Sequence, residues 1–401
     1  MRHFVPDLPP APATDRWAQA KLWLASRLAG AGEQSQEEHT AEAIGRHVES
    51  LGPQHARHLM TRLLDDLQGL GPLADYLRQE GVSDIMVTGE GHVWLDCGHG
   101  VEPTEHRLPR AEVMNLARRL LSQGGRRLDE GQPFGDVFLA GARIHALIPP
   151  VVEHPQLSIR LPHPDTPRLE QLSQQWPHRE YWLRVCEFLV QCRANVLISG
   201  ATGSGKTTLA SSLLSTVDNH ERIITIEDTP ELRIDHPHVV NLRTREANIE
   251  GAGAIETREL IRQSLRMRPD RLIVGECRGA EIAEFLTAMN TGHQGAMGTL
   301  HANSTADVPA RLHAMGGLAG LSPEVLTLQA RSGVDVLMHI CRDEYGRHPA
   351  ELAVLAPEER AGQALTVLPA LTQRGSTLYE GPGLAVVEQL GTKPEWKGLP
   401  R

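Results

Sequence analysis

Eight consecutive residues constrain this chain more than any other part of its sequence. They fit the pattern GxxxxGK(S/T) and are Gly200, Ala201, Thr202, Gly203, Ser204, Gly205, Lys206 and Thr207. An apolar run at 195–199 precedes them, and a helical pattern at 207–216 follows. Glycines let backbone N–H groups converge on phosphate oxygens, and the helix start adds its positive dipole end. The segment therefore predicts a strand, a phosphate loop and a helix that bind a nucleoside triphosphate.

Two side chains of this loop have specific expected roles. Lys206 is one of only four lysines among 40 basic residues, and it is expected to reach the β- and γ-phosphates. The Thr207 hydroxyl is expected to bind Mg²⁺, and the binding segment extends to Thr208. ATP and Mg²⁺ are thus the predicted cofactors.

Hydrolysis needs a carboxylate near the attacking water, and the strand 271–274 ends close to one. Glu276 follows this strand and is the predicted catalytic carboxylate. Gly275 stands where an aspartate commonly holds the metal. The alternative for Glu276 is a structural ion pair with Arg278.

A second acidic group follows the strand at 222–227 and consists of Glu227, Asp228 and Glu231. Since the carboxyl ends of parallel strands meet at one crevice, these carboxylates are candidates for outer-sphere contacts to Mg²⁺. The alternative is an ordinary turn that Asp228 caps.

A glycine- and histidine-rich segment contains His293 and His301. A histidine at a strand end that faces a triphosphate can donate a hydrogen bond to it. A metal site is disfavoured because the two histidines lack partners at ligand spacing. A purely structural histidine is the remaining alternative.

The length of 401 residues indicates two to three domains. The patterns predict an N-terminal helical region with a disordered tip at 1–60, an α+β domain at 61–160 and a linker at 161–177. An α/β nucleotide-binding domain with a parallel sheet is predicted at 178–401. Predicted helices are 110–123, 179–191, 207–216, 255–268, 280–289, 307–315 and 323–332. Predicted strands are 84–88, 92–96, 136–139, 142–148, 156–160, 195–199, 222–227, 271–274 and a hairpin of 351–355 with 364–368.

Composition narrows the class of protein further. The net charge of −10 disfavours a protein that coats nucleic acid. Five cysteines without a CxxC pair indicate neither a disulfide framework nor a cysteine-rich zinc site. Neither a signal peptide nor a transmembrane segment is expected, which favours a cytoplasmic protein.

Four segments, in this order, resemble the secretion ATPase superfamily that powers type II and type IV secretion and type IV pili. GATGSGKTT, ITIEDTPEL, RMRPDRLIVGECRG and NTGHQGAMGTLHANS resemble its Walker A, Asp box, atypical Walker B and His box. The match extends to NLRTREANIEG, LGPL, VSDIMVTG, GRRLDEGQP and ARIHALIPP. Over about 63–355, the chain most resembles the CpaF/TadA-type ATPases of tight-adherence (Flp) pilus assembly.

The resemblance implies an α/β, RecA-like P-loop domain preceded by a smaller α+β domain, assembled as a hexamer with nucleotide between the two. Arginines of the amino-terminal domain reach the phosphates in that family, and the matching positions are Arg143 and Arg160. Further candidates, with surface or interdomain ion pairs as the alternative, are Arg243, Arg245, Arg266 and Arg278.

The expected function is a cytoplasmic ring ATPase that powers pilus assembly or protein secretion by docking peripherally on an inner-membrane platform protein. The chain lacks the tetracysteine insert of many type II ATPases and the AIRNLIREG-like stretch of retraction ATPases. A conjugation or type IV secretion ATPase, a nucleotide-gated scaffold and a nucleic-acid motor are the alternatives. The last is disfavoured by the net charge, so no direct nucleic-acid partner is expected.

Overall fold

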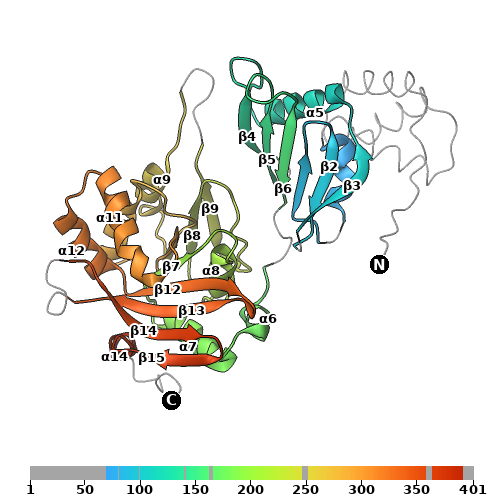
Figure 1. The fold of residues 1–401 in the computed structure, drawn as a ribbon. Coiled ribbons are helices and arrows are strands. Elements are labelled where there is room, and N and C mark those ends of the chain that lie inside the picture. The colour runs from blue at the N-terminus through green and yellow to red at the C-terminus, as the bar shows by residue number, and fades with distance from the viewer. Residues whose placement is uncertain are drawn as a thin grey trace. The chain divides into compact units, whose positions relative to one another are not determined.

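A computed structural model describes residues 69–79, 81–98, 100–139, 141–161, 166–245, 252–357 and 364–391. The chain divides into two compact units, 1–162 and 163–401, and each contains one β-sheet (Figure 1). The helical region predicted at 1–60 lies outside the described residues. None of the helices in the described ranges has the length and apolar character needed to cross a lipid bilayer.

The N-terminal unit is an antiparallel sheet of six strands covered by a helix. In spatial order the strands are β3 (Val101–Arg107), β2 (His92–Asp96), β1 (Asp84–Val87), β6 (Gln156–Arg160), β5 (Ala142–Leu147) and β4 (Phe134–Leu139). The helices are α5 (Arg110–Gln123), the short α4 (Ala74–Leu77) and the 3-10 turn η1 (Gly71–Leu73). Apolar residues of α5, such as Leu116 and Leu120, are buried in one core with those of the strands.

The second unit contains a sheet of nine strands. Six are parallel and lie in the order β12 (Val336–Asp343), β7 (Val196–Gly200), β11 (Met297–His301), β10 (Arg271–Val274), β8 (Ile223–Glu227) and β9 (Val239–Arg243). Beyond β12 the sheet continues antiparallel with β13 (Gly346–Leu355), β14 (Val367–Arg374) and β15 (Thr377–Glu380). The central strand β7 is buried along its whole length, as its continuous apolar sequence predicts.

Helices cover both faces of this sheet and create two apolar cores (Figure 1). One core includes residues of α6 (Leu169–Leu172), α7 (Arg179–Gln191), α8 (Lys206–Leu214) and α14 (Leu384–Gln389). The other includes residues of α9 (Thr257–Ser264), α10 (Ile282–Asn290), α11 (Val308–Leu318) and α12 (Pro323–Gly333). Short 3-10 turns are η2 (Ser173–Gln175) and η3 (Thr305–Asp307). The predicted α/β class with a parallel core is confirmed.

Several elements differ from the sequence-based expectation. Residues 169–175, predicted as part of a linker, form α6 and η2, and Leu169 and Trp176 are buried in the core of the second unit. The linker prediction was wrong for this segment because most of its residues are polar, and they obscure the two apolar residues that pack into the core. The strand β3 was missed because its sequence VEPTEHR is exposed or half-buried throughout and lacks an apolar alternation. The predicted antiparallel partner of 351–355 is present, with Leu355 opposite Val367, but it is the strand Val367–Arg374 and not 364–368.

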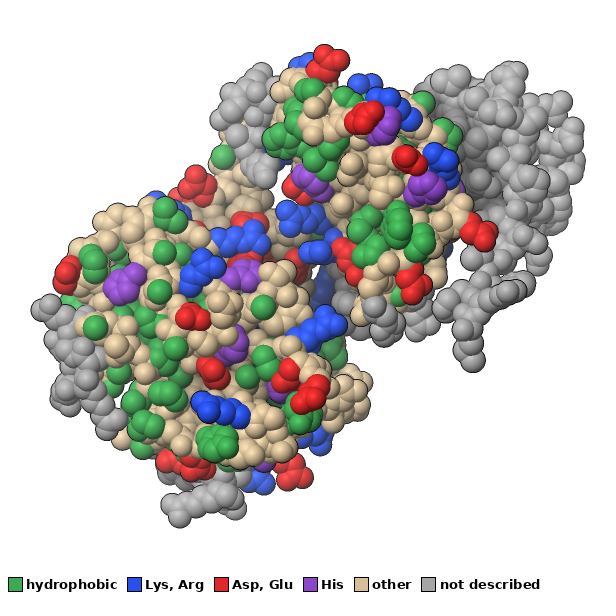
Figure 2. All heavy atoms as spheres, in the orientation of Figure 1, with side chains coloured by type: hydrophobic (Ala, Val, Ile, Leu, Met, Phe, Trp, Pro, Cys, Tyr) green, Lys and Arg blue, Asp and Glu red, His purple; other side chains and the backbone are tan. Residues whose placement is uncertain are grey.

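The surface of the second unit carries both signs of charge. On the face shown in Figure 2, acidic and basic side chains are interspersed with apolar ones. The exposed apolar side chains include Leu318, Val325 and Leu328, which lie on α11 and α12.

Candidate nucleotide site

The phosphate loop connects the end of β7 at Gly200 to the start of α8 at Lys206. Gly203 and Gly205 have φ angles of 72° and 97°, which L side chains rarely adopt, so glycine is required for this turn. A Cβ atom on Gly200 would lie 2.5 Å from Ser204 Oγ and 2.6 Å from the Ile340 carbonyl oxygen. The loop thus holds its backbone in a compact cradle immediately before the helix start.

Lys206 lies inside this cradle and is only 7% exposed. Its Nζ donates hydrogen bonds to the carbonyl oxygens of Gly200 (3.1 Å) and Ala201 (2.9 Å). Burial lowers the pKa of the Lys206 ammonium, and the charges of Glu276 and Glu231 oppose that shift. The lysine is therefore a buried cation that loop carbonyls hold without a direct carboxylate partner among the described residues.

The parallel sheet brings His301 and Glu276 to the same edge. His301 ends β11 and lies opposite Gly200 in the strand register, and its Nδ1 is 3.5 Å from Lys206 Nζ. Its Nε2 is 2.5 Å from Glu276 Oε1, an oxygen that is buried and has no further hydrogen-bond partner in the described part of the chain. The other oxygen of Glu276 forms an ion pair with Arg278. Lys206, His301 and Glu276 thus form a continuous polar line.

Gly275 leaves room for Glu227. A Cβ atom on Gly275 would lie 2.7 Å from Glu227 Cγ, so a larger residue would displace this side chain. Glu227 Oε1 accepts hydrogen bonds from the backbone N–H groups of Glu231 (3.0 Å) and Leu232 (2.9 Å). Burial raises the pKa of Glu227 to about 7 despite these bonds. The absence of an aspartate at 275 is therefore coupled to the buried glutamate on the neighbouring strand.

Three other residues that were predicted to belong to the nucleotide site make contacts outside the line from Lys206 to Glu276. Asp228 Oδ1 accepts a hydrogen bond from Thr257 Oγ1 (3.2 Å), a side-chain contact with the first residue of α9. Arg243 lies opposite Glu227 in the register of β8 and β9. Arg245 Nε donates to the Gly253 carbonyl oxygen at 2.7 Å.

Two secondary candidates lie elsewhere. His293 precedes the first residue of β11, and Arg266 precedes the first residue of β10. Both strands run parallel to β7, whose carboxyl end carries the loop. The two side chains are therefore at the opposite edge of the sheet, and the prediction that they join the nucleotide site is corrected.

A pocket of about 550 Å³ opens beside the loop. Its lining includes Gly200, Thr202, His301, Asn303 and Arg311. Arg311 Nε donates to the His301 carbonyl oxygen at 3.0 Å. The sequence analysis assigned no role to Asn303 or Arg311. Asn303 follows the histidine-bearing strand by two residues, which was a usable signal, whereas Arg311 lies on α11.

Arg347 also contacts the phosphate loop and was not predicted. Its Nε donates to the Gly203 carbonyl oxygen at 3.0 Å, and its Cδ lies 3.3 Å from where a Cβ on Gly205 would be. This arginine is 140 residues or more from the loop in sequence. No sequence pattern identifies it, because the contact depends on how β13 pairs with β12.

Arg143 and Arg160 are direct cross-strand neighbours in the N-terminal unit. Arg143 Nε donates to Asp136 Oδ1 (3.1 Å), and Arg160 Nε donates to Asp84 Oδ1 (2.9 Å). Both guanidinium groups are substantially exposed on the sheet face. His145 Nδ1 lies 3.0 Å from Asp136 Oδ2 and completes the group.

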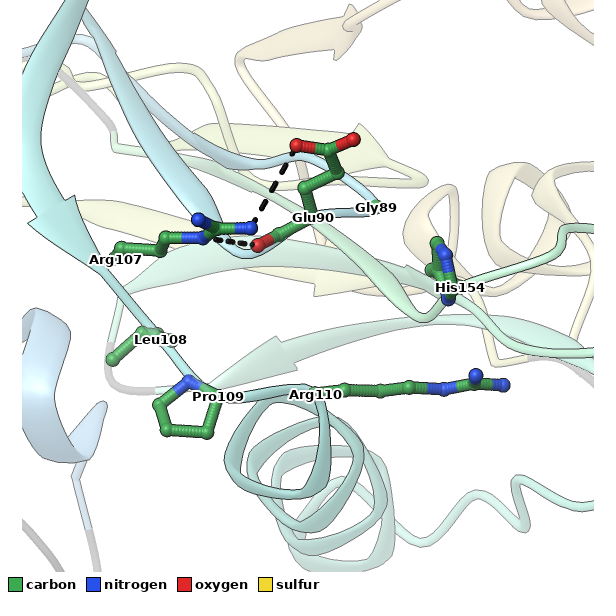
Figure 3. A pocket seen from close by; sticks show the side chains of 7 residues that line it. All are labelled: Gly89, Glu90, Arg107, Leu108, Pro109, Arg110 and His154. Atoms are coloured by element: carbon green, nitrogen blue, oxygen red, sulfur yellow. Dashed lines mark hydrogen bonds and ion pairs between the residues drawn. The ribbon is translucent and has the colours of Figure 1, made fainter.

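The same unit has a second pocket, of about 570 Å³, which the sequence analysis did not predict (Figure 3). It lies where β3 leads into α5, and its charged lining consists of Glu90, Arg107, Arg110 and His154. Arg107 Nε donates to the Glu90 carbonyl oxygen at 3.0 Å, as the dashed lines of Figure 3 show. Arg110 donates to the Glu153 carbonyl oxygen at 3.1 Å.

A phosphate loop after the central strand of a parallel sheet, with an acid and a histidine at neighbouring strand ends, defines a P-loop nucleotide-binding protein. Residues 66–374 match the family described as type II/IV secretion system protein. The chain belongs to this family.

Individual relatives agree with this assignment. A putative conjugal transfer protein of Mycobacterium tuberculosis is 42% identical over 315 residues, which cover 76% of this chain and 90% of that protein. The type IV secretion system protein VirB11 of Bartonella henselae is 31% identical over 275 residues, covering 59% and 77%. The crystal structure of the pilus retraction motor PilT with bound ADP has a TM-score of 0.52 at 22% identity and covers 73% of this chain and 85% of that chain. This last similarity concerns the fold alone.

Proposed function

We propose that this chain is a ring-forming ATPase that hydrolyses Mg²⁺–ATP and drives pilus assembly or protein secretion through an inner-membrane platform protein. The line of contacts from Lys206 through His301 to Glu276 carries the proposal. It joins the lysine of the phosphate loop to a carboxylate that follows β10, two strands from β7 in the sheet. A glycine turn with a purely structural role would not require a lysine, a histidine and a carboxylate in contact beside it.

The residues present fit a bound nucleotide. Ser204 Oγ is buried without a hydrogen-bond partner among the described residues, and the space over Gly203 is open, with no atom within 4 Å of a Cβ built there. Lys206 would exchange its contacts with the Gly200 and Ala201 carbonyl oxygens for phosphate oxygens. Thr207 would hold Mg²⁺, which neutralises phosphate charge when bound, and Thr208 extends the binding segment.

Glu276 is proposed as the carboxylate that orients and deprotonates the attacking water. His301 lies between this carboxylate and Lys206, so its ring can report on phosphate occupancy to both. Glu227 and Asp228 are proposed to make outer-sphere contacts to Mg²⁺, with Glu231, Arg243 and Arg245 as secondary contributors. Because Glu227 Oε1 caps a turn, only its Oε2 atom serves this role.

Arg143 and Arg160 are proposed to stabilise charge on the γ-phosphate, as arginine fingers do. Their exposure and their cross-strand pairing give two adjacent guanidinium groups on one sheet face. Each would leave an aspartate partner when it engages phosphate. This role requires the N-terminal unit to approach the nucleotide, which the proposed hexamer provides.

The resemblance to CpaF/TadA-type ATPases favours extrusion of a pilin, with the ring in the cytoplasm and attached peripherally to the inner membrane. A conjugation or type IV secretion ATPase is the second candidate, and the names of the Mycobacterium tuberculosis and Bartonella henselae relatives favour it. Neighbouring genes separate the two: pilin and prepilin peptidase genes support the first, relaxase and coupling-protein genes the second.

A nucleotide-gated scaffold with little turnover has one observation in its favour. Arg278 pairs with Glu276, and this ion pair would restrain the carboxylate from acting on water. Turnover that appears only when a partner protein is added would agree with such a restraint.

The test is steady-state ATP hydrolysis as a function of protein concentration, with Glu276→Gln alongside. We expect turnover to rise cooperatively with concentration and to fall about 100-fold or more in the variant, while nucleotide binding persists. The exposed Glu259, on α9, provides the control Glu259→Gln, which should leave turnover unchanged. Equal turnover in wild type and Glu276→Gln would refute the assigned role, and a monomer under all nucleotide conditions would refute the ring.

A further inference from the structure

The hairpin of β12 and β13 carries a cysteine, an aspartate and a histidine on one face, and all three are residue types that bind metals. Cys341 and His348 are direct cross-strand partners in the antiparallel register. Asp343 lies two residues beyond Cys341, so the period of two in a strand places it on the same face. The ligating atoms of the three residues all lie within 4.8 Å of one another.

The distances between these atoms match the edges of a coordination tetrahedron. Cys341 Sγ lies 3.7 Å from His348 Nε2 and 3.8 Å from Asp343 Oδ2, and the last two atoms are 3.5 Å apart. Ligand atoms of a tetrahedral Zn²⁺ site, at about 2.0–2.3 Å from the metal, lie about 3.4–3.6 Å from each other. Cys341 Sγ lies nearer to His348 Nδ1, at 3.3 Å, so the imidazole must turn for Nε2 to share an ion with the thiolate and the carboxylate.

The surroundings of His348 and Asp343 support a ligand role. His348 is only 2% exposed, and within the described residues its ring nitrogens have polar contacts with Cys341 and Asp343 alone. Asp343 Oδ1 accepts a hydrogen bond from the Tyr345 N–H at 2.9 Å. This bond fixes the carboxylate and directs Oδ2 to the cluster, as outer-shell contacts do for metal ligands.

We propose that Cys341, Asp343 and His348 form a binding site for a divalent transition metal, Zn²⁺ in the first instance. A thiolate and an imidazole select zinc-class ions over Mg²⁺, which prefers oxygen ligands only. A water molecule would complete the coordination. When the metal binds, the Cys341 S–H bond breaks, an S–Zn bond forms and the proton passes to the buffer. This site is separate from the proposed Mg²⁺ site at Thr207.

The test uses the full chain, freed of metal and titrated with Zn²⁺ in competition with a chromophoric chelator. We expect one Zn²⁺ per chain, with affinity reduced about 100-fold by Cys341→Ser and strongly by Asp343→Asn. The exposed Cys97, in the other unit, gives the matched control Cys97→Ser, which should bind like wild type. Co²⁺ supplies a second readout, since its thiolate charge-transfer absorption should appear in wild type and in Cys97→Ser but not in Cys341→Ser.

Asp343 is exposed at the turn, so Asp343→Asn tests the site without disturbing the core. Thermal unfolding of the metal-free proteins should show that the Asp343→Asn variant remains folded. Stoichiometric binding that neither variant weakens would place the ion on other side chains and overturn the proposal. Absence of Zn²⁺ binding by folded wild type, or Co²⁺ spectra without thiolate absorption, would do the same.

Discussion

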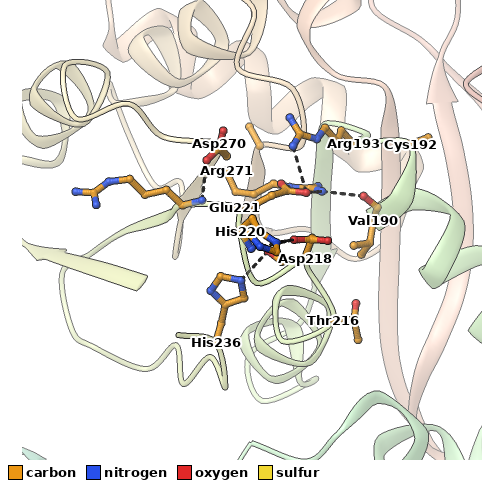
Figure 4. Close-up of polar contacts among 12 residues, drawn as sticks. Val190, Cys192, Arg193, Thr216, Asp218, His220, Glu221, His236, Asp270 and Arg271 are labelled. Atoms are coloured by element: carbon orange, nitrogen blue, oxygen red, sulfur yellow. Dashed lines mark hydrogen bonds and ion pairs between the residues drawn. The ribbon is translucent and has the colours of Figure 1, made fainter. Parts of the chain in front are cut away.

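The two edges of the parallel sheet in the second unit both bury charged side chains, but they do so differently. At the amino edge, Arg271 is 4% exposed, and its guanidinium donates to both carboxylate oxygens of Glu221 and to the Val190 carbonyl oxygen (Figure 4). At the carboxyl edge, Lys206 contacts two loop carbonyls and a histidine. One network pairs its cation with a carboxylate, and the other holds its cation with backbone carbonyls and a histidine.

This difference indicates a structural role for Arg271 and a functional role for Lys206. A buried cation that is fully paired contributes to folding, and its loss leaves a buried carboxylate uncompensated. A buried cation that only dipoles hold is costly to the folded state and is retained for a ligand. Substitutions at the two edges should therefore change different quantities.

The largest effect is expected at the amino edge. Arg271→Ala should lower the free energy of unfolding by about 3–5 kcal/mol, because it removes a buried guanidinium and leaves the largely buried Glu221 with only the more exposed Arg193 as a partner. Denaturant unfolding measures this change. Arg193→Gln is the control, since Arg193 contacts the same carboxylate at 3.2 Å but is 38% exposed, and its effect should stay below about 1 kcal/mol. Equal effects of the two substitutions would mean that burial does not decide the strength of this network.

At the carboxyl edge, Lys206→Ala should weaken nucleotide binding by about 2–5 kcal/mol, since it removes a buried charged donor to phosphate. Its free energy of unfolding should change by less than about 1 kcal/mol, because no carboxylate depends directly on the lysine. Calorimetric titration with a non-hydrolysable ATP analogue and denaturant unfolding give the two values. Loss of stability without loss of binding would reverse the contrast between the edges.

A pH-dependent effect of at most about 3 kcal/mol is expected at Glu227. Burial raises its pKa from 4.5 to about 7, so the folded chain holds this proton more tightly than the unfolded chain. The resulting stabilisation is fully present below pH 4.5 and is lost as the pH rises through 7. Glu227→Gln removes this dependence, so the variant should gain stability relative to wild type between pH 5 and 8. Unfolding curves across this range measure the gain, and a constant difference would contradict the raised pKa.

Local sequence accounted for most of the described strands and helices of the second unit. The residues of the phosphate loop are consecutive in the sequence. Its glycines and the apolar strand before it can therefore be recognised without tertiary information. The strands β9, β12 and β15 were not identified, because their polar residues interrupt the patterns that mark a buried strand. The misplacement of His293 and Arg266 has a related cause. A motif shows which residues occur together in one segment. Whether a given residue lies at the amino or the carboxyl edge of the sheet depends on the direction of the strand.

The sequence by itself determined the phosphate loop, the α/β class and the resemblance to secretion ATPases, because each depends on residues that are neighbours along the chain. Only the tertiary structure placed His301 between Lys206 and Glu276, Glu227 against Gly275 and Arg347 on the loop. The same holds for the group of Cys341, Asp343 and His348, which a hairpin register assembles. These contacts follow from strand order and pairing, which long-range packing selects and no short segment encodes.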